Sequence, residues 1–474
     1  MRIRLAACLI IACICMQSVT INARAQDQGN PSGISSATAT KVVTISAGVA
    51  DYIAIPPFEA ANPGVKVEID PVSPIYSILV ESFLTQDPHI DLYRLNSNLG
   101  IHQALRQKGF FLDLSGNETI RNFIEALAPI FRKQLCVGEQ VMGVPSFLVF
   151  EYPITLNPQI AEEIGLMPDE IPNNLLDLLR FVNRWEEKYG GDFPDYFPFG
   201  AAEASSYALM HYNPFIGLVL EMYKDTLIAQ GEPLRYDTPL FYELLKEIEP
   251  WTYDRSKPYE YWLERIPGEE FCLFYSSQVF SDAVFADLCG RKTLINMPLT
   301  ESSPVVQAYE LECAMVNPAT KQPDLAVELA SYYAMDCQPE LLRILCPNIT
   351  EQYQRPNYAQ DLQEFTDFVD QELRSLELAP PDERREREEH IALLQNILQQ
   401  EIDNPYSITT EALDKYRASI APYLVARGEG PYESELVYAE TMTYAMKWLE
   451  GTSTMEEFGK GLDSLLRMVE SENE

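Results

Sequence analysis

The chain has 474 residues, a hydrophobic content of 46% and an aromatic content of 11%. These values exclude general disorder and predict a globular protein with two domains or lobes, because one core rarely grows to this size. Acidic residues outnumber basic ones by 71 to 35, which leaves a net charge of −36. Duplex nucleic acid and anionic membrane surfaces should repel such a chain, so neither is an expected partner.

The N-terminus has the three-part layout of a secretory signal. Two arginines precede an apolar run over residues 5–16, and Ala23-Arg24-Ala25 forms an A-x-A cleavage site before a polar stretch. We expect residues 1–25 to be removed as a signal peptide. Residues 26–40, rich in Ser, Thr, Gly and Ala, are predicted to form a flexible linker.

Export predicts an extracytoplasmic location, either secreted or held at the outer face of the cell membrane. The apolar run is too short for a membrane span. A lipid anchor on Cys8 or Cys13 remains the alternative to simple cleavage.

Six cysteines lie beyond the signal: Cys136, Cys272, Cys289, Cys313, Cys337 and Cys346. A bridge between Cys337 and Cys346 is one interpretation, and burial of all six as small apolar side chains is the other. No C-x-x-C or clustered Cys/His spacing suggests zinc, so we expect neither a metal nor a cofactor.

The first regular elements alternate between strand and helix. Strands are predicted at residues 41–46, 65–69 and 89–96, and helices within residues 47–64, 73–86 and 99–109, the last ending at Gly109. This alternation predicts a mostly parallel sheet with crossover helices.

The rest of the chain is richer in helices. Helices are predicted at residues 157–166, 173–190, 205–231, 239–248 and 323–335, and β-structure at residues 269–277, 292–299 and 305–318. Residues 347–474 are helical and charged, and we interpret the charge run at residues 380–402 as a solvated helix face.

The order of these segments resembles the extracellular solute-binding proteins of ABC importers, of the family 1, sugar-binding type. The matching segments are VVTISAG…PFEAANPGVKVEI, DPHIDLYRLN…ALRQKGFFLDLS, GEQVMGVPSFLVFEYPITLNPQIAEEIGL, PGEEFCLFYSS before KTLINMPL, LECAMVNPATKQPDLAVELASYYA and the C-terminal YAMKWLEGTSTMEEFGKGLDSLLRMVESE. Together they extend over most of residues 41–474.

The resemblance implies an α/β, two-lobed periplasmic-binding-protein-like fold (type II). Each lobe would be a mixed, mostly parallel sheet with flanking helices, with extra helices at the C-terminus. Residues 41–148 and 291–346 would form the first lobe, and residues 149–290 and 347–474 the second. The family further implies a monomer that binds a small solute between its lobes, closes by hinge bending and delivers the solute to a membrane permease.

Pro145 interrupts an apolar run that continues beyond it. In the family this segment leaves the first lobe, so Pro145 and its successors would lie at a hinge crossing. Because proline cannot donate to a sheet ladder, an edge strand containing a proline is the alternative.

In open α/β sheets the ligand lies beyond the carboxyl ends of the strands, which nominates polar and aromatic residues there. The predicted ligand-binding residues are Asp51, Asn96, Ser97, Asn98, Ser146, Phe147, Tyr212, Trp262, Tyr275, Ser276 and Gln278, with Trp251 as an alternative to Trp262. Hydroxyl and amide groups suit a hydroxyl-rich ligand, and aromatic faces stack on sugar rings. The alternative is structural: the asparagines would cap a helix and the aromatics would be core.

The sequence lacks G-x-S-x-G, H-E-x-x-H and Walker A motifs, and its four histidines have no metal-ligand spacing. We therefore expect a binding protein with no catalytic residues and a carbohydrate or similar polyhydroxylated ligand. A secreted glycoside hydrolase, which needs only two carboxylates, and a secreted interaction protein that kept the fold are the alternatives.

Overall fold

The computed structural model describes residues 41–46, 51–70, 82, 85, 87–97, 100–150, 152–201, 213–252, 271–276, 293–355, 357–377, 380–403, 405–427 and 435–473. Residues 354–407 form a compact unit of their own, distinct from residues 41–353 and 408–474. The larger unit contains two sheets, each with its own hydrophobic core, and these are the two lobes.

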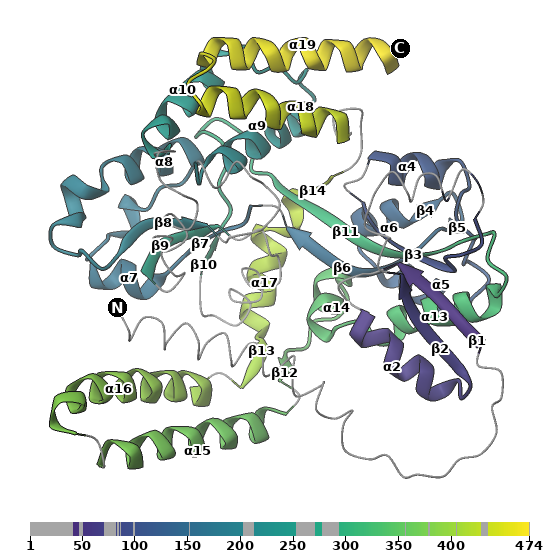
Figure 1. The fold of residues 1–474 in the computed structure, drawn as a ribbon, viewed down its shortest axis with the longest axis horizontal. Coiled ribbons are helices and arrows are strands. Elements are labelled where there is room, and N and C mark those ends of the chain that lie inside the picture. Colours follow the sequence, from purple (N-terminus) through teal and green to yellow (C-terminus); the bar gives the residue numbers. More distant parts are fainter. Residues whose placement is uncertain are drawn as a thin grey trace. The chain divides into compact units, whose positions relative to one another are not determined.

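The first lobe is built on a six-stranded mixed sheet (Figure 1). Its strands are β1 (Lys41–Ser46), β2 (Val65–Asp70), β3 (Leu92–Asn96), β6 (Val144–Phe150), β11 (Gln307–Val316) and β14 (Leu424–Ala426). β1 pairs in parallel with β2 and β3, whereas β11 runs antiparallel to β3 and β6 and parallel to β14. Every residue of β11 is buried, as expected of a central strand.

Helices and one short hairpin complete the first lobe. They are α2 (Asp51–Ala61), α4 (Gly100–Gln107), α5 (Glu118–Ala126), α6 (Pro129–Leu135), β4 (Cys136–Val137), β5 (Gln140–Val141), α13 (Pro323–Met335), α14 (Pro339–Leu345), α17 (Thr410–Ser419) and a 3₁₀ turn at Ala421–Tyr423. The core of this lobe is mostly aliphatic, with Val43, Ile45, Leu92 and Leu311 fully buried.

The second lobe has a four-stranded sheet in the order β10, β7, β9, β8. Its strands are β7 (Ile154–Leu156), β8 (Phe197–Ala201), β9 (Cys272–Ser276) and β10 (Thr293–Ile295). β7 runs antiparallel to both of its neighbours, and β8 runs parallel to β9. The sheets of both lobes are therefore mixed, but in the described part of the second sheet antiparallel pairing dominates.

The helices of the second lobe come from two distant parts of the chain. They are α7 (Pro158–Glu163), a 3₁₀ turn at Pro168–Glu170, α8 (Leu175–Asn183), a π-helical turn at Glu186–Gly190, α9 (Ile216–Gln230), α10 (Pro239–Ile248), a 3₁₀ turn at Glu249–Trp251, α18 (Glu435–Leu449) and α19 (Met455–Asn473). Side chains of α18 and α19 such as Trp448, Phe458 and Leu462 belong to the same core as α8, α9 and α10.

The lobes differ from the predicted boundaries in three places, the first being residues 354–407, which were expected in the second lobe but form the separate unit. Residues 408–427 were expected in the second lobe, but β14 pairs with β11 and Leu413 and Tyr416 are buried in the first core. Residues 293–299 were expected in the first lobe, but β10 pairs with β7 and Met297 packs in the second core. Short strands join whichever sheet offers a partner, and the local sequence does not specify that partner.

Pro145 lies inside β6, opposite Cys313, next to an irregularity in the pairing. The described partner of β6 is β11, so the proline occupies an edge strand, where its missing N–H costs least. The chain leaves the first sheet after Phe150 and enters the second at Ile154. The interpretation of an edge strand is therefore confirmed, and the crossing follows Pro145 by several residues.

Most predicted elements are present with similar bounds. Glycines end two helices where predicted, since Gly109 and Gly165 have φ of 73° and 67°. Side-chain caps begin others: Asn174 Oδ1 accepts the Asp177 N–H at 2.9 Å, and Thr238 Oγ1 accepts the Phe241 N–H at 3.2 Å. The predicted helix at residues 73–86 and the first half of that at 205–231 lie mainly outside the described residues.

The separate unit is a pair of helices, α15 (Tyr358–Glu377) and α16 (Pro381–Asp403), bordered by the short strands β12 (Tyr353–Gln354) and β13 (Tyr406–Ile408). Its buried apolar side chains are Val369, Ile391 and Leu394. Arg384 and Glu388 in the charge run of α16 are exposed, which agrees with a solvated face.

The described cysteines Cys136, Cys272, Cys313, Cys337 and Cys346 are free thiols, so Cys337 and Cys346 are not bridged; Cys289 lies outside the described residues. Burial raises the pKa of Cys346 to about 11, as expected of an inert thiol. Among the described helices, none combines the length and the apolar character that a membrane span requires.

Candidate functional site

The two lobes are joined by three crossings of the chain. The first runs from Phe150 to Ile154, the second from β10 to β11, and the third from β14 to α18. Tyr152 lies in the first crossing and has a positive φ of 47°. Among the described residues, every other positive φ belongs to a glycine. A bulky side chain in this conformation is strained, which is common at switch regions.

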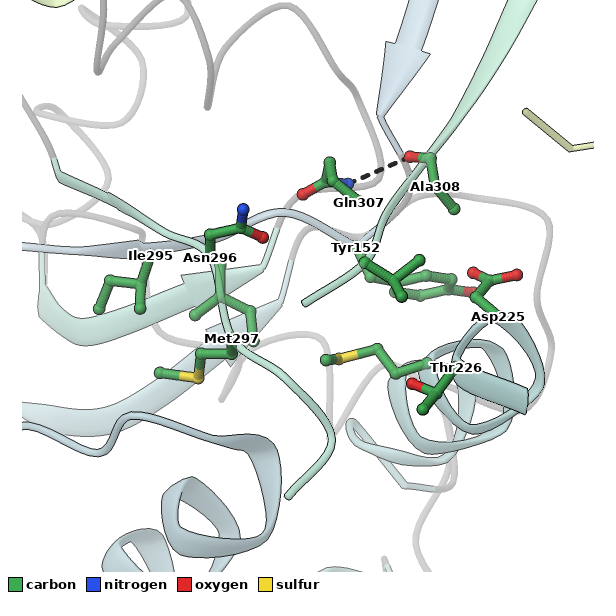
Figure 2. Close-up of a pocket in the computed structure, with 11 residues that line it drawn as sticks. Tyr152, Asp225, Thr226, Ile295, Asn296, Met297, Gln307 and Ala308 are labelled. Carbon is green, nitrogen blue, oxygen red and sulfur yellow. Dashed lines mark hydrogen bonds between the residues drawn. The ribbon is translucent and has the colours of Figure 1, made fainter. Parts of the chain in front are cut away.

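A cavity lies between the first two crossings and α9 (Figure 2). Tyr152, Asp225, Asn296 and Gln307 are among its lining residues, and Gln307 Nε2 donates to the carbonyl of Ala308 at 3.1 Å. The volume open to the centre of a water molecule is about 20 Å³. This space admits about one water molecule and no sugar ring, so the cavity is part of the joint between the lobes.

The carboxyl edge of the first sheet brings predicted residues together. Asn96 on β3 and Phe147 on β6 both lie opposite Glu312 of β11, one on each side. The three residues therefore form a row across three adjacent strands, and the pairing of β6 with β11 is irregular directly beside Phe147. Asn96 and Phe147 are half-buried and Glu312 retains 10% exposure of its side chain.

Ser146 belongs to a buried charge network beside this row. Arg94 forms an ion pair with Glu312, and its Nη2 donates to Ser146 Oγ at 2.8 Å. Nη1 of Arg94 donates to Tyr333 Oη at 2.8 Å, and the guanidinium lies 4.4 Å from the centre of that ring. Ser146 Oγ is also 3.1 Å from Oε1 of Glu312. The hydroxyl of Ser146 therefore holds the network together inside the first lobe.

Ser97 has a similar structural position. Its Oγ accepts the N–H of Leu311 at 2.8 Å, and its own N–H donates to the Leu311 carbonyl at 2.8 Å. Ser97 is 2% exposed. These bonds continue the β3–β11 ladder by one residue, so Ser97 fixes the edge from which Asn96 projects.

Two predicted residues lie at the end of β9 in the second lobe. Ser276 pairs with Ile154 and Tyr275 with Thr155, next to the first crossing. Ser276 is 3% exposed, and its Oγ has no hydrogen-bond partner. A buried hydroxyl without a partner carries a desolvation cost that a ligand or water could relieve.

The remaining predicted residues are not brought together by the described structure. Asp51 is the first residue of α2. Asn98, Tyr212, Trp262 and Gln278 lie outside the described residues.

The alternative candidate Trp251 is packed into the second lobe. Its ring lies 5.7 Å from that of Phe215, and its Nε1 donates to Asn183 Oδ1 at 2.7 Å. Its half-buried ring therefore packs on Phe215, and its Nε1 is engaged at the surface by the exposed Asn183.

Three charged residues that were not predicted as part of a site are buried at the same edge: Arg94, Glu310 and Glu312. The signal was present: two acidic residues at i and i+2 interrupt the apolar strand AYELECAMV, and one arginine interrupts DLYRLN. Charged side chains in central strands are rare unless paired, so such interruptions mark a paired site.

No family model and no curated protein matches the sequence. Solved structures do match the fold. The maltose-bound MalE3 of T. maritima is 14% identical with a TM-score of 0.52, and the match covers 90% of this chain and 99% of that one. An ABC substrate-binding protein from Listeria monocytogenes, in complex with cycloalternan, is 12% identical with a TM-score of 0.54 and coverage of 91% and 99%.

The GacH receptor of Streptomyces glaucescens, studied without ligand and with acarbose, is 11% identical, has a TM-score of 0.52 and is matched over 91% of this chain and 98% of its own. At these identities the likeness establishes the fold. The chain has the two-lobed α/β fold of ABC solute-binding proteins over about nine-tenths of its length.

Proposed function

We propose that this protein is the extracytoplasmic solute-binding component of an ABC importer and that it binds a carbohydrate or another polyhydroxylated solute between its lobes. The observation that carries the proposal is the pair of lobes joined by three crossings, a fold shared with proteins whose structures contain maltose, cycloalternan and acarbose. All three compounds are rich in hydroxyl groups.

The proposed ligand contacts lie on the carboxyl edges of the two sheets. Asn96 and Phe147 supply an amide and an aromatic face from the first lobe, and Tyr275 and Ser276 supply hydroxyl groups from the second. Ser97 and Ser146 position the edge of the first sheet rather than contact the ligand, because their hydroxyl groups form hydrogen bonds inside the first lobe. Asp51, Asn98, Tyr212, Trp262 and Gln278 remain predicted contacts.

The surroundings of Glu312 on β11 support a binding protein without catalytic activity. Glu312 forms an ion pair with Arg94 and accepts a hydrogen bond from Ser146, so its carboxylate is held in the charge network of the first lobe. A glycoside hydrolase would need two carboxylates free to act as acid and base or nucleophile. The proposed partners are the solute and a membrane permease, and the proposed solution state is a monomer.

Isothermal titration calorimetry of the purified protein with maltose, raffinose and ribitol tests the proposal. We expect saturable binding to at least one of these compounds, with the compound recovered unchanged by chromatography. Recovery of a cleaved product would establish the hydrolase instead. Absence of binding to these compounds and to a wider sugar panel would overturn the carbohydrate proposal and favour the interaction protein.

A pair of matched variants locates the site. Phe147→Ala removes a half-buried ring at the proposed edge, and Phe123→Ala removes a half-buried ring on α5, away from it. We expect Phe147→Ala to weaken binding at least about tenfold, as loss of a stacking ring does, and Phe123→Ala to bind as the parent does. Equal affinities for both variants would place the ligand elsewhere.

Light scattering after gel filtration tests whether the protein is a monomer in solution.

A further inference from the structure

A buried cluster of four charges connects the lobes. Arg427 follows β14 in the first lobe, and Glu221, Lys224 and Asp225 lie on α9 in the second. Arg427 Nη2 lies 2.7 Å from Glu221 Oε2 and 2.9 Å from Asp225 Oδ2, and Lys224 Nζ lies 2.8 Å from Glu221 Oε2. The four side chains are between 5% and 17% exposed. The cluster therefore brings two basic side chains and two carboxyl groups together in a largely buried environment, where burial raises the pKa of Asp225 against the opposing charges of Arg427 and Lys224.

Arg427 is fixed to the first lobe by its backbone. Its N–H donates to the carbonyl of Tyr309 in β11 at 3.0 Å, and its carbonyl accepts Nε2 of Gln134 in α6 at 3.4 Å. Its guanidinium extends into the second lobe. The residue therefore spans the joint, with its main chain in one lobe and its charge in the other.

Helix α9 lies beside all three crossings. Met222, Asp225 and Thr226 share the cavity of Figure 2 with Tyr152 of the first crossing and Gln307 at the end of the second. Tyr152 also touches α9 closely, since its Oη lies 3.0 Å from the position that a Cβ on Gly217 would occupy. Arg427 begins the third crossing. The cluster is thus located where the connections between the lobes converge.

The electrostatic environment of Glu221 agrees with a tightly held cluster. Burial by itself would raise its pKa, but the charges of Arg427 and Lys224 outweigh burial and hold the pKa at about 2. The carboxylate is therefore ionised throughout the physiological pH range. Moving Arg427 away would take two carboxylates from a buried guanidinium, which is strongly unfavourable, although Lys224 would still face Glu221.

We propose that the cluster of Arg427, Glu221, Lys224 and Asp225 is the pivot of lobe movement. A rotation about a distant axis would pull the guanidinium from its carboxylates, whereas a rotation through Arg427 keeps the ion pairs intact. The cluster thereby restricts the lobes to one narrow hinge motion, and the crossings, including the strained Tyr152, absorb the change in backbone angles. The use of this pivot in ligand capture rests on the proposed function, but the experiment that tests the pivot does not.

The test measures the distance between the lobes without any ligand. Spin labels are attached through a genetically encoded keto amino acid at two exposed positions, Glu125 on α5 and Glu162 on α7, so that the free cysteines stay unlabelled. Pulsed electron spin resonance then gives the distribution of inter-lobe distances. Because no sugar is added, the result is decisive even if sugar binding is not found.

The main variant neutralises the whole cluster: Glu221→Gln, Lys224→Met, Asp225→Asn and Arg427→Met. Removing all four charges avoids an unpaired buried ion, so the fold should persist. We expect the width of the distance distribution to increase about twofold, since more lobe orientations become accessible. The matched control, Arg235→Met with Glu470→Gln, removes an ion pair internal to the second lobe, 3.1 Å long, and should leave the width unchanged.

An unchanged width in the folded neutral variant, or equal broadening in the control, overturns the proposal. If the neutral variant does not fold, Arg427→Lys provides the second test, because it keeps the charge but replaces the planar fork by a single ammonium. A distribution broader than that of the parent supports the pivot, and an identical distribution refutes it.

Discussion

Both lobes bury charges and aromatic rings, but the first lobe places an ion pair between adjoining strands of its sheet, whereas the second groups aromatic rings around α10. In the first lobe, Arg94, Glu310 and Glu312 are all less than a tenth exposed and lie on adjoining strands of the sheet. In the second, Phe241 is fully buried, with ring centres of Tyr236 at 4.9 Å and Tyr223 at 5.1 Å. Both lobes are α/β, so this difference arises from side chains rather than from architecture.

The contrast explains why the two lobes should respond differently to substitution. A buried ion pair is stable only while both partners are present, because each compensates for the desolvation of the other. An aromatic cluster is stabilised by apolar area and close packing, which no single partner can replace. A loss at the Arg94–Glu312 ion pair can therefore be recovered by a second substitution, whereas a loss in the aromatic cluster around Phe241 cannot.

The largest expected effect comes from Arg94→Met. The substitution takes the opposing charge of Arg94 away from the buried Glu312, and we expect the free energy of unfolding to fall by about 3 to 5 kcal/mol in urea denaturation. The double variant Arg94→Met with Glu312→Gln should recover most of this loss. If single and double variants lose the same amount, the charge network does not stabilise the first lobe as described.

Phe241→Ala is the corresponding change in the second lobe. Removing a fully buried ring leaves a cavity against Tyr223, Tyr236 and Phe458, and we expect a loss of about 3 to 4 kcal/mol in the free energy of unfolding. Phe197→Ala, at a ring that is 38% exposed, is the control and should cost much less. Similar losses for both variants would contradict the role given to the aromatic core.

His102 should make the stability of the first lobe depend on pH. It is 2% exposed on α4 of the first lobe, and burial, together with the charge of Arg106, lowers its pKa to about 3. A histidine with a depressed folded pKa stabilises the fold above its ordinary pKa and loses this contribution as the pH falls, because the unfolded chain takes up the proton first.

Between pH 7 and pH 4.5 the parent protein should therefore lose about 2 to 3 kcal/mol more stability than His102→Leu. Urea denaturation of both proteins at each pH measures the difference directly. Parallel pH profiles would show that His102 is not held neutral by the first lobe.

The smallest expected effects concern helix caps, one in each lobe. Asn174 caps α8 of the second lobe from a buried position, and its Nδ2 also donates to Asp177 Oδ2 at 2.7 Å. Asn117 caps α5 of the first lobe with one bond, to the N–H of Ile120 at 3.1 Å. We expect losses of about 1 to 2 kcal/mol for Asn174→Ala and about 0.5 to 1 kcal/mol for Asn117→Ala in thermal unfolding. The reverse order would show that burial of the cap is unimportant.

The sequence by itself determined the local elements and their order. The β-branched run at residues 41–46 forms β1, the glycine at position 165 ends a helix in positive φ, and α9 begins within its predicted segment. These features depend on neighbours along the chain, through side-chain period, turn residues and caps. The alternation of strands and helices indicated a sheet with crossover helices, and the resemblance of the segments to the solute-binding family implied the two lobes.

Tertiary structure alone decided which sheet the short strands β10 and β14 join and which charges meet. Arg94 and Glu312 are 218 residues apart, and Arg427 and Asp225 are 202 residues apart. No local pattern specifies such a pair, since each residue is merely an interruption in its own apolar segment. Ser97 follows the end of β3 as predicted, whereas Ser146, expected beyond a strand, lies inside β6. The hydrogen bonds of both serines inside the first lobe depend on β11, a strand from a distant part of the chain.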